Sequence, residues 1–484
     1  MPTLSIHSHG CADITDGEYC LLFDPWLIGS AYWRSWWNFP EPSDFSALCK
    51  RLIRYKVVYV YITHLHWDHF HAPTIRRLVN SLPNLHFLIP KVPEIRLAND
   101  LRDVLPRNVH YQEIPQNSIF YVSENFYFKI FLSGFFVTDS AVLVNIGNVQ
   151  VLNLNDSKPL NILSKSIKSS INKDLLITLR SHSSANARVC RRLRNGDMPI
   201  QSQDSLNEYS RQFIETAKFF RTNIAIPFAS NMCYLHKDTF QYNKHSNTAD
   251  VVSSFALEHD ITFVKLVLPR ENLDLDTLIV NMDKQSREQL FADRDTQLLD
   301  YRLRKISSLE CTDRMSVSPI MFSRLVTHYF AKFFSTLPCW YSLLLSSGVA
   351  FSPSHEFVEG FSFTVIPFSN LVSWSQVDFS SSKSCIVVPL EVLVSILKTR
   401  NFDSLGISKR VLICADHYGY YRLFLAALVY TDLGVFPLTL RTIYRLFSSW
   451  IWRAPEILDL ISLALKLKIK SFQVDSLNPS KESK

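Results

Sequence analysis

A dense group of histidines directly behind an apolar segment is the feature that most constrains this chain. Residues 57–62 read Val-Val-Tyr-Val-Tyr-Ile, and such a short β-branched and aromatic run predicts a buried strand. His64, His66, Asp68 and His69 follow it within six positions. All four side chains therefore lie just beyond the end of one predicted strand.

These four residues suit a transition-metal site. Neutral imidazoles and a carboxylate are ligands for zinc, iron or manganese. On a turn, His64 and His66 can face one ion, and Asp68 and His69 a second. Two ions about 3.5–4 Å apart would share a hydroxide that is nucleophilic at neutral pH. The alternative is a polar loop that contains histidines by chance. This interpretation is the weaker one, because three histidines and an aspartate follow the same strand.

In the order His64-Leu-His66-Trp-Asp68-His69, the motif resembles the signature of the metallo-β-lactamase superfamily, over roughly the first half of the chain. The resemblance implies an α/β (α+β) fold, a four-layer αββα sandwich with metals at one edge. Most members are hydrolases that use zinc, iron or manganese, and some are oxygenases or oxidoreductases with two irons.

The resemblance also assigns two later ligands. A predicted hairpin at Gly147-Asn148 returns as a strand that ends at Asp156, where relatives carry the metal-bridging aspartate. The alternative for Asp156 is a helix N-cap. A late strand over residues 223–230 is followed by His236, which matches the last histidine ligand in order, with His245 as a weaker competitor.

One ligand of the superfamily is missing. Relatives carry a further histidine ahead of the bridging aspartate, but residues 131–140 contain none. The first metal site would then use Asp139, His182 or water. We therefore expect one or two divalent ions, zinc first, with iron or manganese as alternatives.

Three short segments indicate one branch of the superfamily: residues 24–27, 153–156 and 227–230. They resemble a branch that contains the metallo-β-lactamase part of CMP-N-acetylneuraminic acid hydroxylase and bacterial proteins of sugar biosynthesis. That hydroxylase also carries a Rieske centre, which needs a Cys-x-His pair. No cysteine here has a histidine two positions on, so an oxygenase reaction would need a separate electron donor.

Candidate substrate contacts flank the motif. Residues 4–7 and 19–23 predict two strands joined by a polar turn, and Asp24 follows, either orienting a ligand or forming a turn. In the aromatic stretch 31–40, Trp33 and Arg34 can cover a substrate and pair with its negative charge, although packing at the mouth of the sandwich explains most of these aromatics. His182 follows the predicted strand 175–179 and is expected at the rim of the site.

With 484 residues, of which 47% are hydrophobic, the chain is too long for one ordinary domain. We predict a metal-binding domain over residues 1–270, a helical connector over 271–312 and an α+β domain over 313–484. The element order of the last part weakly resembles a sterol-carrier-protein-like domain. The plainer interpretation is an α+β domain that packs on the core and shapes the pocket.

Charge and cysteine usage limit the partners. The net charge of +7 comes from scattered residues, which permits an anionic or sugar-derived small molecule but does not indicate nucleic-acid binding. Nine widely spaced cysteines are typical of reduced thiols in a cytoplasmic protein. The sequence contains neither a signal-peptide pattern nor an apolar run that spans a bilayer.

Three functions remain open. The leading prediction is a hydrolase in which a metal-bound hydroxide attacks an ester, amide or phosphate bond, with Asp68 orienting it or accepting a proton. The second is a di-iron oxygenase acting on a nucleotide sugar or related metabolite. The third is a degenerate, non-catalytic metal-binding protein, which the missing histidine favours.

Overall fold

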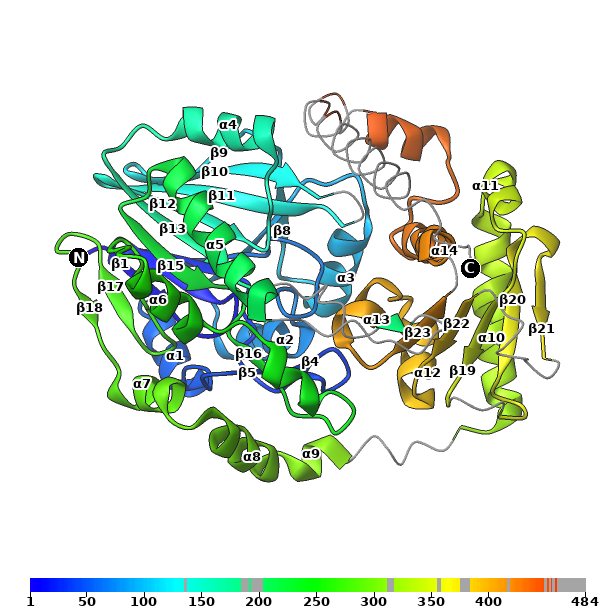
Figure 1. Cartoon of the computed structure of the whole chain (residues 1–484). Coiled ribbons are helices and arrows are strands. Elements are labelled where there is room, and N and C mark those ends of the chain that lie inside the picture. The colour runs from blue at the N-terminus through cyan, green and yellow to red at the C-terminus, as the bar shows by residue number, and fades with distance from the viewer. Residues whose placement is uncertain are drawn as a thin grey trace, which may run out of the picture.

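The computed structural model describes residues 1–134, 137–183, 191–192, 203–310, 317–354, 358–374, 384–415 and 418–447, with residues 451, 454 and 458. Two large sheets with helices outside them occupy one side of the molecule, and a third sheet with its own helices occupies the other (Figure 1). The N-terminus lies at the edge of the first sheet, on the side away from the third sheet.

The first sheet has eight strands in the order β18-β17-β1-β2-β3-β6-β7-β8. Residues 57–61 form its strand β6, which pairs in parallel with its neighbours on both sides. The eight strands are β18 (Val280–Asn281), β17 (Asn272–Asp274), β1 (Thr3–Ile6), β2 (Ala12–Thr15), β3 (Tyr19–Phe23), β6 (Val57–Tyr61), β7 (Leu85–Pro90) and β8 (Tyr111–Ile114).

Strand β2 was not predicted. The sequence suggested a single turn between residues 7 and 19, but Ala12–Thr15 pairs with both β1 and β3. This short strand leaves a tight loop from His7 to Cys11, closed by His7 N–H donating to Cys11 O at 2.8 Å. Because the loop is short, it keeps His9 close to the end of strand β1. A longer turn would have carried His9 away from that strand end.

The second sheet runs β15-β13-β12-β11-β10-β9. The predicted hairpin at residues 147–148 is confirmed, since β11 and β12 pair antiparallel across it. Beyond β12 the sheet is parallel. The six strands are β15 (Ile224–Phe228), β13 (Leu175–Ser181), β12 (Val149–Asn155), β11 (Asp139–Ile146), β10 (Phe126–Ser133) and β9 (Ile119–Ser123).

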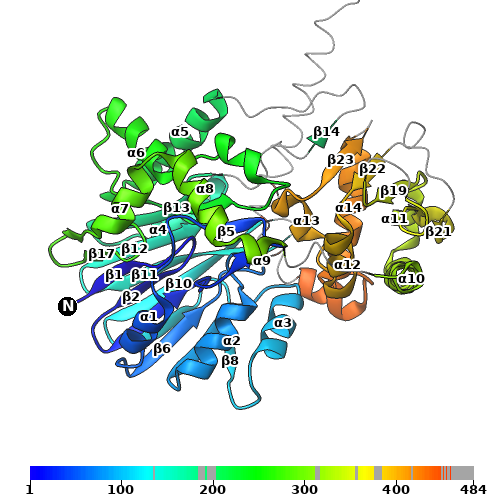
Figure 2. The ribbon, with the colours of Figure 1, turned by 90° about the horizontal axis from the view of Figure 1, so that it is seen from below.

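The two sheets and their helices form the four layers that the resemblance implied. Inward-facing residues such as Phe23, Tyr61, Phe128 and Val151 make one apolar core between the sheets. Helices α1 (Phe45–Leu52), α2 (Ala72–Ser81) and α3 (Arg96–Val104) cover the outer face of the first sheet. Helices α4 (Asn161–Ser170), α5 (Gln203–Phe220) and α6 (Ala249–Glu258) cover that of the second (Figure 2).

The predicted boundary at residue 270 precedes β17 and β18, which extend the first sheet beyond it. Three helices then follow in the segment predicted as a connector: α7 (Lys284–Phe291), α8 (Arg294–Arg304) and α9 (Ile306–Glu310). They carry the chain along the side of the sandwich (Figure 1). Leu298, Tyr301 and Leu309 pack against Trp37 and Phe39, so the segment is attached to the sandwich by an apolar contact.

The C-terminal part is built around the sheet β14-β23-β22-β19-β20-β21 and a large aromatic core that includes Phe330, Phe351 and Phe402. Five strands come from the C-terminal part itself: β23 (Leu412–Ala415), β22 (Ser384–Val387), β19 (Val349–Ser352), β20 (Phe363–Ile366) and β21 (Leu371–Ser373). The edge strand β14 (Arg191–Arg192) is contributed by the first half of the chain and pairs with β23. The helices of the C-terminal part are α10 (Pro319–Thr336), α11 (Cys339–Leu344), α12 (Leu390–Thr399), α13 (Asp403–Ser408) and α14 (Tyr418–Asp432). It therefore mixes strands and helices as predicted, while its likeness to a sterol-carrier domain stays a prediction.

A small sheet, β16-β5-β4, closes the mouth of the sandwich. It joins β16 (Met232–Tyr234), β5 (Trp36–Asn38) and β4 (Ser30–Ala31). Trp26, Tyr32, Trp36 and Tyr234 pack together there, so much of the aromatic stretch is packed at the mouth of the sandwich, as the plainer interpretation held. In the described part of the chain, no helix is both long and apolar enough to span a bilayer.

Candidate metal centre

The polar residues of the centre meet because their strands end at one edge. Strands β1, β3 and β6 run in the same direction in the first sheet, as do β12 and β13 in the second. His9, Asp24 and the 64–69 motif follow the first three strands, and Asp156 and His182 follow the other two. Parallel strands present their carboxyl ends together, so residues distant in sequence converge.

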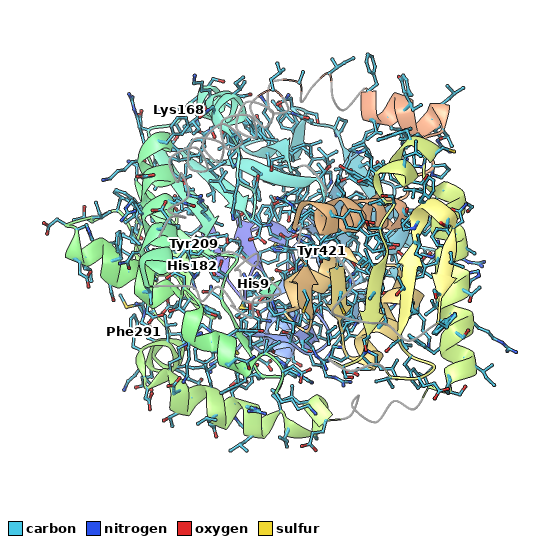
Figure 3. All side chains as sticks on the ribbon, turned by 45° about the vertical axis from the view of Figure 1, so that its right-hand side comes forward. His9, Lys168, His182, Tyr209, Phe291 and Tyr421 are labelled. Atoms are coloured by element: carbon cyan, nitrogen blue, oxygen red, sulfur yellow. The ribbon has the colours of Figure 1, made fainter. Side chains whose placement is uncertain are left out.

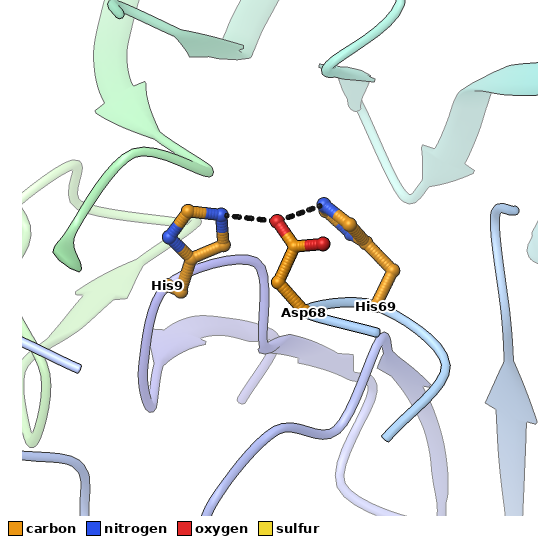
Figure 4. Close-up of side chains that lie close together, drawn as sticks. All are labelled: His9, Asp68 and His69. Atoms are coloured by element: carbon orange, nitrogen blue, oxygen red, sulfur yellow. Dashed lines mark ion pairs between the residues drawn. The ribbon is translucent and has the colours of Figure 1, made fainter. Parts of the chain in front are cut away.

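His9, Asp68 and His69 form one group of ligand atoms. His9 Nε2 lies 3.0 Å and His69 Nε2 3.3 Å from Asp68 Oδ2 (Figure 4). All three residues are buried, and these atoms lie within 4.8 Å of one another. Neither His9 Nε2 nor His69 Nε2 makes a hydrogen bond of acceptable geometry. Buried polar atoms rarely remain unpaired in a native structure, so the group suits a cation.

His64, His69 and Asp156 form an overlapping group within the same distance limit. His69 Nε2 lies 3.5 Å from Asp156 Oδ2. The other nitrogen, Nδ1, already lies 3.0 Å from Asp24 Oδ2. His69 therefore has one nitrogen for a metal, and a second ion would rely on the remaining residues.

Asp24 holds this arrangement in place from full burial. It accepts hydrogen bonds from Thr63 N–H at 2.7 Å and from Asn155 Nδ2 at 3.0 Å. A carboxylate on Nδ1 fixes the tautomer of neutral His69, the form that binds a metal, so that Nε2 carries the lone pair. Asp24 thus orients His69, one of the two roles that the sequence left open.

Charge in the centre favours a cation. Burial raises the pKa of Asp68, but His69 and His9 outweigh it and hold that pKa well below its usual value. Burial likewise opposes ionisation of Asp156, yet His69 lowers its pKa to about 2. Burial opposes the charge on His69, but Asp68 and Asp24 raise its pKa well above its usual value. Both carboxylates are therefore ionised at neutral pH, and without a metal they hold a proton on His69.

His182 lies beside these residues, toward the middle of the molecule (Figure 3). It is 1% exposed, and neither ring nitrogen has a hydrogen-bond partner of acceptable geometry. Burial lowers its pKa to about 3, and the nearby His9 adds to this effect. The ring is neutral at pH 7, so a lone pair is available for a metal.

The remaining predicted ligands are placed differently. His66 Nδ1 lies 2.8 Å from His64 Nε2, and His66 Nε2 lies 2.8 Å from Asp403 of the C-terminal part. Burial lowers the pKa of His66, but the hydrogen bond to Asp403 outweighs it and raises that pKa. Asp139 Oδ1 lies 3.3 Å from His64 Nδ1.

His236 belongs to neither group of described ligand atoms. It is buried, with Nδ1 3.4 Å from Asp238 Oδ2. Asp238 in turn accepts from Arg410 Nη2 at 3.0 Å. The metal-binding role of His236 therefore stays a prediction. His182, which we expected at the rim of the site, is buried near His9.

Trp33 and Arg34 line a cavity of about 760 Å³ between the sandwich and helix α12. The Trp33 ring lies 4.8 Å from that of Trp67, centre to centre. Tyr32 also lines this cavity, and its hydroxyl donates to Asp68 Oδ1. Tyr32 therefore contacts both the cavity and a ligand residue, which suits the predicted substrate contacts at Trp33 and Arg34.

Sequence reasoning missed His9, Tyr32 and Asp403. For His9 a signal existed, because a His-Gly pair directly after an apolar strand is expected where backbone approaches another group closely. Tyr32 lay within an aromatic stretch whose members could not be ranked. Nothing near Asp403 in the sequence indicated a contact with His66.

Comparison with known proteins supports the resemblance. No family model matches the chain. The human protein "inactive cytidine monophosphate-N-acetylneuraminic acid hydroxylase" is 30% identical over 152 residues, 31% of this chain and 29% of that protein. The hydroxylase of Cricetulus griseus is 31% identical over 153 residues, 31% of this chain and 26% of that protein. The matched stretch thus spans less than a third of the length of these relatives.

Among solved structures, a variant of the CmlA beta-hydroxylase has a TM-score of 0.39 at 15% identity, covering 57% of this chain and 54% of that chain. The sequence match confirms the resemblance to the branch that contains the CMP-N-acetylneuraminic acid hydroxylase.

Proposed function

We propose that this chain is a metal-dependent hydrolase acting on an ester, amide or phosphate bond. The observation that carries the proposal is the convergence of histidine and aspartate ligand atoms, among which His9 Nε2 and His69 Nε2 are buried without hydrogen-bond partners. A catalytic site of this kind needs ligands on one side and an open position on the other. Asp156 and His66 are partly exposed, which supports an open side there.

The donor set fits one or two divalent ions. His9, Asp68 and His69 would hold one, with His182 beside them, and His64, His66 and Asp156 would hold or share a second. Imidazole nitrogens and carboxylate oxygens suit zinc, manganese and iron alike. When bound, such ions make water a nucleophile at neutral pH and polarise the bond to be cleaved.

Asp68 would fix the geometry of the neighbouring ligands rather than accept a proton. Burial and the charge of Asp68 raise the pKa of Tyr32 well above its usual value, so its hydroxyl stays protonated and donates to Asp68 Oδ1. This hydrogen bond leaves Oδ2 directed at His9 and His69. A carboxyl whose pKa is so low is a weak base, so Asp68 would fix the ligand geometry.

The substrate would enter beside Trp33, Arg34 and Trp67. Arg34 Nη1 is buried without a hydrogen-bond partner, as is Trp33 Nε1. Two unpaired donors next to a cavity support a substrate rich in acceptors, such as an anionic or sugar-derived molecule. In this proposal the cavity wall positions the substrate, and Tyr32 connects that wall to Asp68.

The first experiment is elemental analysis of protein purified without added metal, followed by assays on ester and phosphodiester substrates. We expect about two equivalents of zinc or manganese and activity that a chelator abolishes. The variant His69→Ala should lose both metal and activity, because its one available nitrogen reaches Asp68 and Asp156. Full activity in that variant would refute the assignment.

A second candidate is an iron oxygenase acting on a nucleotide sugar. The match to a protein named cytidine monophosphate-N-acetylneuraminic acid hydroxylase favours it. No Cys-x-His pair for a Rieske centre occurs in this sequence. Bound iron, with oxygen consumption only when a reductant and a CMP-sugar are supplied, would place this candidate first.

A further inference from the structure

A carboxylate of the C-terminal part reaches the metal centre. Asp403 begins helix α13, and its Oδ2 lies 2.8 Å from His66 Nε2 across 337 positions of sequence. Both side chains are 23% exposed, so the contact lies at the open side of the centre.

The two nitrogens of His66 face in opposite directions. Nδ1 lies 2.8 Å from Nε2 of His64, a member of the second group of ligand atoms, while Nε2 meets Asp403. His69 shows the same construction, with Nε2 toward Asp68 and Nδ1 held by Asp24 at 3.0 Å. A histidine that binds a metal through one nitrogen commonly donates the other N–H to a carboxylate, which fixes the ring.

Helix α13 is held firmly enough to aim this carboxylate. Phe402, directly before it, is fully buried, and its N–H donates to Asp432 Oδ2 at 3.1 Å. Leu405, within the helix, is also fully buried. Beyond its end, Arg410 donates to Trp33 O at 3.0 Å and is paired with Asp238 and Glu391. Both ends of α13 are therefore fixed, one to its own core and one to the sandwich.

We propose that Asp403 is a positioning residue for the metal centre, holding His66 so that Nδ1 faces the metal. The C-terminal part would then complete the centre rather than only cover it. This inference rests on the proposed metal-binding function. Asp24 performs the same task for His69 from within the sandwich, so the two carboxylates would orient two ligands from two different parts of the chain.

The test is a titration of metal-free, full-length protein with cobalt(II) against a competing chelator, followed by its visible spectrum. Asp403→Asn keeps the size of the side chain but removes its charge. We expect cobalt affinity to fall about 10–100-fold, the usual effect of losing such a partner, with a changed cobalt spectrum. Asp403→Glu should restore most of the affinity.

Arg96→Ala is the matched control. Arg96 donates to the carbonyls of Thr399 and Arg400, so it also joins the sandwich to the C-terminal part, but it does not touch the motif. We expect unchanged cobalt affinity and spectrum. If this variant lost as much affinity as Asp403→Asn, the effect would come from docking of the two parts, and the positioning role would be wrong.

The remaining outcomes separate this inference from the proposed function. If the wild-type chain binds cobalt and Asp403→Asn matches it in affinity and spectrum, the positioning role is overturned while the metal centre stands. If the wild-type chain takes up no cobalt, the proposed metal-dependent function fails, and the role of Asp403 fails with it. Circular dichroism of each variant shows that its fold is retained.

Discussion

Gly10 lies against the ring of His69, in the loop between β1 and β2. A Cβ atom at this position would come within 2.8 Å of His69 Cε1 and 3.0 Å of Nδ1. Real side chains do not approach so closely, and His69 cannot yield, because Asp24 holds its Nδ1. The loop therefore depends on the absence of a side chain rather than on an unusual backbone conformation.

We expect Gly10→Ala to displace His69 and to lower metal affinity at least about tenfold, the scale of effect seen when a ligand loses its support. Elemental analysis after dialysis against a weak chelator measures this. Gly419→Ala is the control, because an added Cβ there meets nothing within 4 Å. A Gly10→Ala protein with a full complement of metal would show that His69 is free to move.

Asp432 supports a prediction far from the ligands. Burial raises the pKa of its carboxyl to about 6, although Phe402 N–H and the Tyr329 hydroxyl both donate to it. An unfolded aspartate has a pKa of about 3.9. The protonated acid therefore favours the folded state below about pH 4, and this contribution is lost as the pH rises through 6.

Relative to Asp432→Asn, the wild-type chain should thus lose about 2–3 kcal/mol of unfolding free energy between pH 4 and pH 7. Urea unfolding of the two proteins at several pH values measures the difference. A difference that stays constant with pH would mean that Asp432 titrates normally.

At the residue scale, the sequence predicted the kinds of residue that form the centre better than it predicted the full set of residues that do so. His64, Asp68, His69 and Asp156 do lie together, because each follows a strand whose hydrophobic pattern is strong. His9 was missed, and His182 was only one of several options for the first metal site. Their importance comes from the unpaired nitrogens that burial leaves them, and burial of a polar residue at a loop is not encoded in local periodicity.

The turn between β4 and β5 is the element that connects the cavity to the centre. Tyr32, Trp33 and Arg34 have φ angles of 51°, 54° and 64°, in the left-handed region. Each non-glycine residue there costs about 1–2 kcal/mol. Hydrogen bonds offset this cost: the Tyr32 hydroxyl donates to Asp68, and Trp37 Nε1 donates to Arg34 O at 3.0 Å.

Tyr32→Phe keeps the ring that stacks on Trp67 but removes the donor to Asp68. We expect weaker metal binding and about 1–3 kcal/mol lower unfolding free energy, because a buried carboxylate oxygen is left unpaired. Cobalt titration and urea unfolding measure the two effects. Tyr301→Phe, in a separate apolar cluster with Trp37, should leave metal affinity unchanged. If the two variants had the same metal affinity and the same unfolding free energy, the expected link between Tyr32 and metal binding would be wrong.

Strands and turns were predictable where one local sequence pattern determines them. Long apolar runs such as that of β6 and the hairpin of β11 and β12 were predicted at nearly their observed bounds. Strand β2 was missed because Ala-Asp-Ile-Thr is short and two of its four residues are polar. Asp13 of this strand is fully buried only because Arg51 and His7 pair with it, a compensation that lies elsewhere in the chain.

At the scale of the whole molecule, the metal would contribute to stability. Without a cation, the carboxylates of Asp24, Asp68 and Asp156 all lie next to His69. A ligand present at 100 times its dissociation constant stabilises the folded state by about 2.7 kcal/mol. We therefore expect a chelator to lower the thermal midpoint and re-added metal to restore it, as followed by calorimetry. An unchanged midpoint would mean that no resident metal binds the folded chain.

The arrangement of the two parts was the least predictable feature. Helical and strand patterns indicated an α+β segment after residue 313, yet they could not show which of its faces meets the sandwich. That contact depends on single polar residues far apart in sequence, such as Arg410 with Asp238. Such pairs are specific to one packing and leave no periodic signal.

If Asp403 positions His66 as proposed, its hydrogen bond to His66 makes metal binding and docking of the C-terminal part thermodynamically dependent on each other. If docking of that part tightens metal binding by some factor, the metal must tighten docking by the same factor. A chain that loses its ion would then hold its two parts together less firmly. Metal supply in the cell would in this way set how rigid the enzyme is as well as how active.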